Sequence, residues 1–184
     1  MTYTALLLTA FLAQAPAGNT YSVNLHQSAI HYTIVHKLHK VQAESKLVQG
    51  KAVLKPDGGL QVMVRAAISS FESGDGNRDE HMRETLEDSK YAFVTYKGVA
   101  KLASGTLPPK LDVVIDGELE FHGRKQPEKV TVHLDTAGPT ATHATGHLTV
   151  SLDRYQIERP SLLFMKIDDA CVIDFDLQLT GGGH

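Results

Sequence analysis

The stretch Ile68–Gly98, ISSFESGDGNRDEHMRETLEDSKYAFVTYKG, decides how the rest of the chain is interpreted. Its Gly-Asp-Gly turn at 74–76 ends an extended segment, and Asp75 or Asn77 is placed to cap a helix. Residues 77–87 are rich in good helix formers and predict one short helix before the chain becomes extended again. A single helix inserted among strands must cover something, such as a sheet edge or the mouth of a barrel.

On both sides of this helix, apolar and polar residues alternate with a period of two, which is the pattern of half-buried strands. Short strands with tight turns indicate an antiparallel sandwich or barrel. One apolar row per strand, opposite a charged row, favours a sheet curled around its own interior. We predict strands at residues 21–25, 30–35, 47–55, 60–69, 91–102, 111–121, 129–135, 145–153 and 170–179.

Three connecting segments carry weaker signals. The pattern of residues 36–41 is ambiguous and allows a turn of helix that joins two strands. Residues 122–127 are predicted to be a polar turn, and residues 154–166 an irregular segment with one helical turn. The final residues, 181–184, are predicted to be a disordered tail.

The apolar rows are the candidate binding residues, because they would face the interior of a barrel. An interior of about eight strands is either filled by side chains or holds one small ligand, and periodicity alone leaves both open. A glycine inside one of these rows marks a bend or a close approach by backbone or ligand. The predicted lining residues are Ile34, Val62, Val64, Phe93, Val113, Ile115, Gly117, Leu119, Phe121 and Val150.

The composition fits one domain with a sizeable core. The chain has 184 residues and a formal net charge of −3, which argues against a general nucleic-acid binder. Its single cysteine, Cys171, has no partner for an internal disulfide and is interpreted as a small buried hydrophobic residue.

The N-terminus differs from the rest of the chain. Ala5–Ala13 is an uncharged apolar run, followed by small residues that resemble a signal-peptidase site with cleavage after Ala17. The segment before this run is atypical, because it lacks the Lys or Arg usual in a signal peptide. The run itself is shorter than the roughly 20 residues of a membrane span. We therefore predict that residues 1–17 are a cleaved secretory signal, with a buried strand or an anchor as the alternative.

Several motifs follow one another in a family-specific order. Ser70–Gly74, Arg78–Met82 and Tyr91 form the first group, and Ser28–Ile30 leading to His36 lies upstream. Further downstream come the strand and turn 117–123 followed by Pro127, and then the closing segments 144–157 and 169–177. Together they resemble the YceI-like family. The match differs from the usual pattern in a shorter segment at 83–91, in Ala92 where a proline is common, and in a more polar turn at 124–126.

The resemblance implies an eight-stranded antiparallel, lipocalin-like β-barrel at 18–180 with one short inserted helix at about 77–87. It further implies a bacterial protein that is exported to the periplasm or the cell exterior. Its apolar channel would sequester or carry a polyisoprenoid or a similar long-chain amphipathic lipid, without catalysis. At the mouth, Arg78, His81 and Arg83 are candidate headgroup contacts, although Arg78 and Asp79 better suit a role in capping the helix and tying it to neighbouring loops.

The remaining chemistry is sparse. No nucleophile motif, phosphate loop or metal-binding motif is present, and the acidic row Asp112, Asp116, Glu118 and Glu120 is expected on the solvated exterior. His143 and His147 would lie about 13 Å apart on one face of a strand, too far to share a metal ion.

We therefore expect no cofactor and no metal site. The alternative hypotheses are a haem- or metal-binding stress or electron-transfer protein that uses strand histidines, and a packed barrel that acts through a protein partner. A homodimer is left open.

Overall fold

The fold is taken from a computed structural model, which describes residues 18–36, 39–138, 140–159, 161–162 and 165–182. The predicted signal segment 1–17 lies outside the described residues. Strands make up most of the described chain: β1 (Asn19–Val23), β2 (Ala29–His36), β3 (His39–Ser45), β4 (Val48–Leu54), β5 (Gly59–Ala67), β6 (Phe93–Lys101), β7 (Lys110–Phe121), β8 (Arg124–Thr136), β9 (Ala141–Ser151), β10 (Ser161–Leu162), β11 (Met165–Lys166) and β12 (Ala170–Gly182). The helical segments are η1 (Ile68–Ser70), α1 (Gly76–Thr85) and η2 (Asp153–Tyr155).

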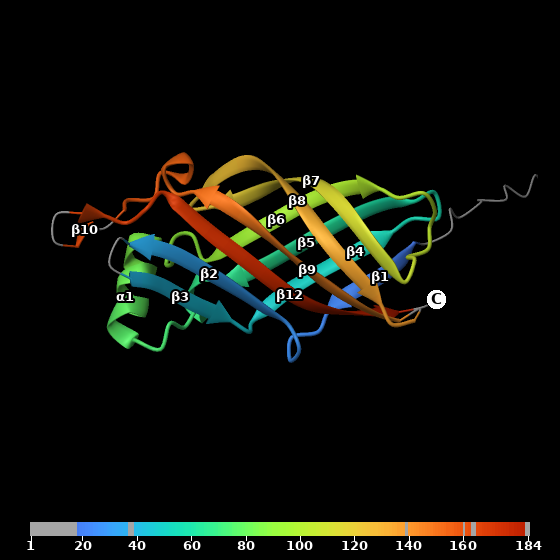
Figure 1. The fold of residues 1–184 in the computed structure, drawn as a ribbon, viewed down its shortest axis with the longest axis horizontal. Helices are drawn as coiled ribbons and strands as arrows, with labels where there is room; N and C mark the ends of the chain where they lie inside the picture. Colours follow the sequence, from blue (N-terminus) through green and yellow to red (C-terminus); the bar gives the residue numbers. More distant parts are fainter. Residues whose placement is uncertain (1–17, 37–38, 139, 160, 163–164, 183–184) are drawn as a thin grey trace, which may run out of the picture.

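Eight strands close into an antiparallel barrel in the order β1, β4, β5, β6, β7, β8, β9 and β12. The ring closes because β1 pairs with β4 on one edge and with β12 on the other, so that Tyr21 lies opposite both Ala52 and Gly181. The barrel is elongated, with α1 and β10 at one end and the C-terminus at the other (Figure 1). The predicted eight-stranded antiparallel barrel with one inserted helix is confirmed.

The hairpin of β2 and β3 extends the barrel wall at the α1 end. β2 pairs with the first half of β12 and β1 with its second half, so the two strands follow one another along the same edge. The pattern at 36–41, which allowed a helical turn, belongs to strands on both sides of the undescribed residues 37–38, because β3 pairs with β2 along its whole length. Apolar Val41 and Ala43 alternate with exposed Lys40 and Gln42, which is a strand pattern.

A correction concerns the turn between β7 and β8. The polar segment 122–127 was expected to be a turn, but only His122 and Gly123 form it, with φ angles of 49° and 67°. Two residues at positive φ make the tight hairpin turn whose twist matches antiparallel strands. β8 therefore begins at Arg124 and includes Pro127.

At the other end of the chain, the expected tail is shorter than predicted. β12 runs on to Gly182 and pairs with β1, whereas Gly183 and His184 lie outside the described residues.

The helix α1 is fixed by two aspartates. Asp75 is its N-cap, and its carboxylate accepts hydrogen bonds from the backbone N–H groups of Asn77 and Arg78 at 3.1 and 3.2 Å. Asp79, in the first turn, is buried and accepts from the backbone N–H of Ser73 at 3.0 Å. The helix thus stands in a fixed position at the end of the barrel, beside β2 and β3 (Figure 1).

The 3-10 helix η2 packs against β8 and β9, where these two strands no longer pair with each other. Pairing between β8 and β9 stops at Thr131 and His147. Tyr155 of η2 is fully buried, and its hydroxyl donates to the Glu128 carboxylate, which also pairs with Arg154 at 2.9 Å. Burial, together with this carboxylate, raises the pKa of Tyr155. The helical turn expected in the 154–166 region is therefore present, at 153–155, and it packs against β8 and β9.

Candidate functional site

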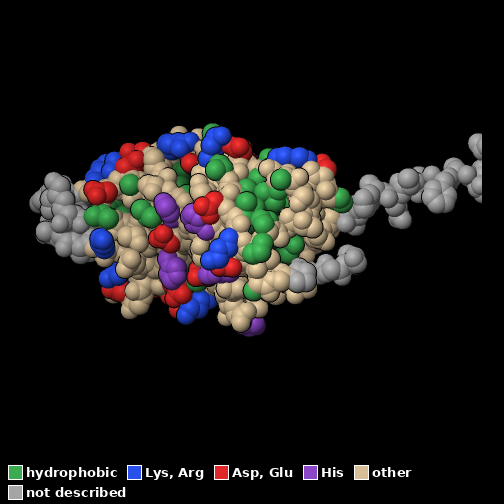
Figure 2. All heavy atoms as spheres, turned by 45° about the vertical axis from the view of Figure 1, so that its right-hand side comes forward, with side chains coloured by type: hydrophobic (Ala, Val, Ile, Leu, Met, Phe, Trp, Pro, Cys, Tyr) green, Lys and Arg blue, Asp and Glu red, His purple; other side chains and the backbone are tan. Residues whose placement is uncertain are grey.

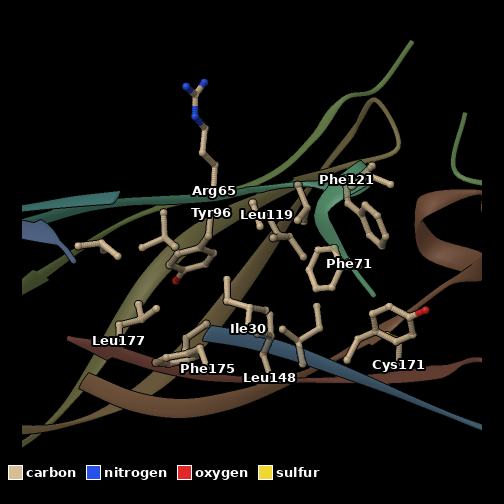
Figure 3. A pocket seen from close by; sticks show the side chains of 18 of the residues that line it. Ile30, Arg65, Phe71, Tyr96, Leu119, Phe121, Leu148, Cys171, Phe175 and Leu177 are labelled. Atoms are coloured by element: carbon tan, nitrogen blue, oxygen red, sulfur yellow. The ribbon is translucent and has the colours of Figure 1, made fainter. Parts of the chain in front are cut away.

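The interior of the barrel is a single elongated cavity of about 740 Å³, a size within the range of about 300–1,000 Å³ usual for small-molecule sites. It runs between apolar side chains from β2, β5, β7, β9 and β12, which point toward one another across the barrel (Figure 3). Seven of the ten residues predicted from the sequence line it: Ile34, Val62, Val64, Val113, Ile115, Leu119 and Phe121.

The prediction for Phe93 is wrong. Phe93 lies on the outer face of β6, 40% exposed, with the Arg65 guanidinium 4.5 Å from its ring centre. Val94 and Tyr96 line the cavity instead, because the inward row of β6 contains the even-numbered residues. The other two predicted residues, Val150 and Gly117, have different roles. Val150 does not line the cavity; it is fully buried and packs in the cluster that includes Leu152.

Gly117 makes room for the side chain of Tyr96. A Cβ atom at position 117 would lie well inside van der Waals contact with the Tyr96 ring and 2.5 Å from the Lys97 carbonyl oxygen. The Tyr96 hydroxyl lies within hydrogen-bonding distance of two backbone carbonyl oxygens, at 3.0 Å from that of Ile115 and 3.1 Å from that of Glu128. Burial raises the pKa of Tyr96 to about 12, so the phenol stays neutral. Gly117 therefore shapes the cavity through its neighbour.

The cavity approaches solvent at the α1 end. Met82 and Leu86 of the helix region line it together with Arg78 and His81, and Glu158 lies on the same rim. The His81 side chain is 84% exposed and lies 3.5 Å from Glu84, and Arg78 lies 3.5 Å from Asp75. Arg83 is on the same helix but is outside the lining. Of the three predicted headgroup contacts, two therefore stand at this rim.

The opposite end of the cavity is closed. Tyr21, Leu60 and Leu107 line it there, packed with the fully buried Leu54. Thr142 of β9 also lines this end and is itself buried. The site is thus a blind channel that opens beside α1.

A large part of the lining escaped the sequence prediction. It comes from the inward-facing residues of β2, β9 and β12: Ile30, Tyr32, Ala144, Leu148, Cys171, Ile173, Phe175, Leu177 and Leu179. The signal was present, since the odd-numbered residues from 171 to 179 form one apolar row.

The thiol of Cys171 is part of this wall. Burial raises its pKa to about 12, against about 8.5 for a free cysteine. Because only the thiolate is nucleophilic, we expect iodoacetamide at pH 8 to alkylate Cys171 about a thousandfold more slowly in the folded protein than after unfolding in urea. Mass spectrometry of the intact chain measures this, and rapid labelling of the folded protein would contradict the buried position.

The outer surface carries paired charges. Histidine and acidic side chains lie side by side on one face of the barrel (Figure 2), and His133 and His143 pair with Asp112 and Asp176 at 2.7 Å. The acidic row of β7 points outward and pairs with lysines of β8, for example Glu118 with Lys125. Within the described part of the chain, no group of three or more His, Cys, Asp or Glu side chains is arranged to hold a metal ion. No helix among the described residues is long and apolar enough to cross a membrane.

A closed antiparallel barrel around an apolar cavity, with a helix at its mouth, is a lipocalin-like architecture. The sequence profile of the YceI-like domain matches residues 21–179, and the chain belongs to this family.

Solved structures with this fold resemble the chain at low sequence identity. A polyisoprenoid binding domain from Saccharophagus degradans, implicated in plant cell wall breakdown, is 18% identical with a TM-score of 0.73, and the match covers 88% of this chain and 98% of that one. BcnA from Burkholderia cenocepacia is 15% identical with a TM-score of 0.69, covering 85% and 98%. The YceI protein of Campylobacter jejuni is 10% identical with a TM-score of 0.64, covering 81% and 90%. No curated protein sequence matches the chain.

Proposed function

We propose that the protein binds one long-chain amphipathic lipid, of the polyisoprenoid class, inside the barrel and carries or sequesters it without catalysis. The observation that carries this proposal is the apolar channel of about 740 Å³, with Arg78, His81 and Glu158 among its lining residues at the α1 end. The polyisoprenoid binding domain of Saccharophagus degradans, which shares the fold, supports the choice of lipid class.

The energetics favour a chain that enters tail first. Burying each methylene is worth about 0.8 kcal/mol, so a chain of ten or more carbons binds tightly in a dry channel without a polar anchor. The headgroup then remains at the rim, where Arg78 and His81 are the candidate contacts. Arg83, one helical turn further along, would reach only a headgroup that extends over α1.

The decisive experiment is organic extraction of the purified full-length protein followed by mass spectrometry. We expect a stoichiometric prenyl or similar long-chain lipid, or uptake of an added polyprenol by the delipidated protein. A protein that neither carries nor takes up a long-chain lipid would overturn the proposal.

We also propose that the protein is exported and works in the periplasm or outside the cell. The apolar run and small-residue site at 5–17 support this. The intact mass of the protein recovered from the periplasm or medium tests it: we expect a chain that begins at Gly18, whereas an uncleaved cytoplasmic chain would contradict export.

A further inference from the structure

Three tyrosines line the cavity: Tyr21 at the closed end, Tyr96 in the middle and Tyr32 between the barrel and α1. The hydroxyl of Tyr96 is engaged by backbone carbonyl groups of β7 and β8. For Tyr32, by contrast, the described residues provide no hydrogen-bond partner for the hydroxyl. Its ring is held by packing alone, 5.6 Å from that of Phe71.

Tyr32 lies at the boundary between the two apolar clusters that line the channel. It packs against both apolar clusters of the barrel, the one around Val113 and Leu134 and the one around Leu119 and Leu152. Its phenol therefore forms part of the cavity wall where the two clusters meet.

The charges around Tyr32 define what its hydroxyl can bind. Burial raises the pKa of Tyr32 to about 12, and the Cys171 thiol and the Asp79 carboxylate act in the same direction, against the opposing effect of Arg78. The phenol is therefore protonated at any physiological pH and can donate a hydrogen bond. The buried Asp79 carboxylate disfavours a second negative charge here, so an anionic group belongs further out at the rim.

We propose that Tyr32 is a specificity-determining residue whose hydroxyl donates a hydrogen bond to a neutral oxygen at the head end of the ligand. The ligand class is then a long chain whose first polar group is an alcohol, ester or ketone oxygen, with any charge further along the headgroup. This inference rests on the proposed function, because it assumes that a chain occupies the cavity.

The test compares two probes of equal chain length, octadecan-1-ol and octadecane, presented together in cyclodextrin to the delipidated full-length protein. Gas chromatography of the extracted complex gives the ratio of bound alcohol to bound alkane. We expect this ratio to fall about 3- to 10-fold in Tyr32→Phe, because one neutral hydrogen bond is lost while the apolar contacts stay. Tyr155→Phe is the matched control, because Tyr155 lies outside the cavity lining and its hydroxyl donates to Glu128, and we expect the wild-type ratio.

A second readout uses the wild-type protein itself. Methyl octadecanoate labelled with carbon-13 at its carbonyl should show a carbonyl infrared band at lower wavenumber when bound to the wild type than when bound to Tyr32→Phe. A band at the position of a free carbonyl in the wild type would overturn the inference, whether or not the variant folds.

The outcomes separate the two proposals. An unchanged ratio in Tyr32→Phe, or an equal fall in Tyr155→Phe, overturns the role of Tyr32 while the lipid-binding function stands. If the wild-type protein takes up neither probe and no polyprenol, the proposed function fails and this inference with it.

Discussion

Gly117→Leu is expected to destabilise the barrel by about 3 kcal/mol, an overpacking cost at the upper end of the usual range. The space that a side chain would need at position 117 holds the ring of Tyr96, and the Lys97 carbonyl oxygen would lie 2.5 Å from the new Cβ. β6 and β7 place Gly98 opposite Gly117, so neither strand has side-chain atoms at this point. The leucine would therefore displace the ring and its hydrogen bonds to β7 and β8.

Urea unfolding of Gly117→Leu measures this effect. Gly76→Ala is the matched control, because a Cβ at the start of α1 meets no atom within 4 Å, and we expect wild-type stability or slightly more. A Gly117→Leu protein that unfolds at the wild-type urea concentration would mean that the Tyr96 ring can leave its position freely. The sequence-based assignment of Gly117 to the channel wall implies a different result, namely a blocked channel in a barrel that still folds.

This difference shows where sequence patterns stop being informative. Alternation predicts the eight-stranded barrel, because each strand carries one apolar row that must face a common interior. It does not predict which neighbour fills the space above a glycine, since that depends on the register between β6 and β7. The same limit explains Phe93, which was predicted to face the interior, whereas β6 begins at Phe93 with this side chain on its outer face.

The sequence predicts an apolar interior site, but it identifies only part of the residues that line it. The rows of β5 and β7 are long and regular, and they contain six of the seven predicted residues that line the cavity. The rows of β9 and β12 contain glycine, threonine and cysteine among the apolar residues, which weakens the pattern although their inward residues line the same cavity. Leu107 at the closed end of the cavity and the residues of η2 belong to connecting segments. The packing of such segments produces no repeating pattern of apolar residues, so it could not be predicted in this way.

Leu148→Trp is expected to close the channel while leaving the barrel folded. Leu148 points into the cavity from β9 (Figure 3) and packs against both apolar clusters, so an indole at this position would fill the middle of the channel. A long chain would then reach only the part beside α1. At about 0.8 kcal/mol per methylene, the loss of three buried methylenes costs about 2.4 kcal/mol, or roughly 50-fold in affinity.

The matched control is Val114→Trp, which adds the same indole to the outer face of β7, where Val114 is 52% exposed. Both variants are compared by the amount of polyprenol extracted per mole of folded protein, with the melting temperature measured alongside. We expect Val114→Trp to retain the wild-type lipid content and Leu148→Trp to lose most of it. Equal lipid content in all three proteins, each of them folded, would place the lipid outside the barrel and remove the cavity as the binding site. A short chain such as decanol provides the internal check, because it fits between α1 and the indole and should still bind to Leu148→Trp.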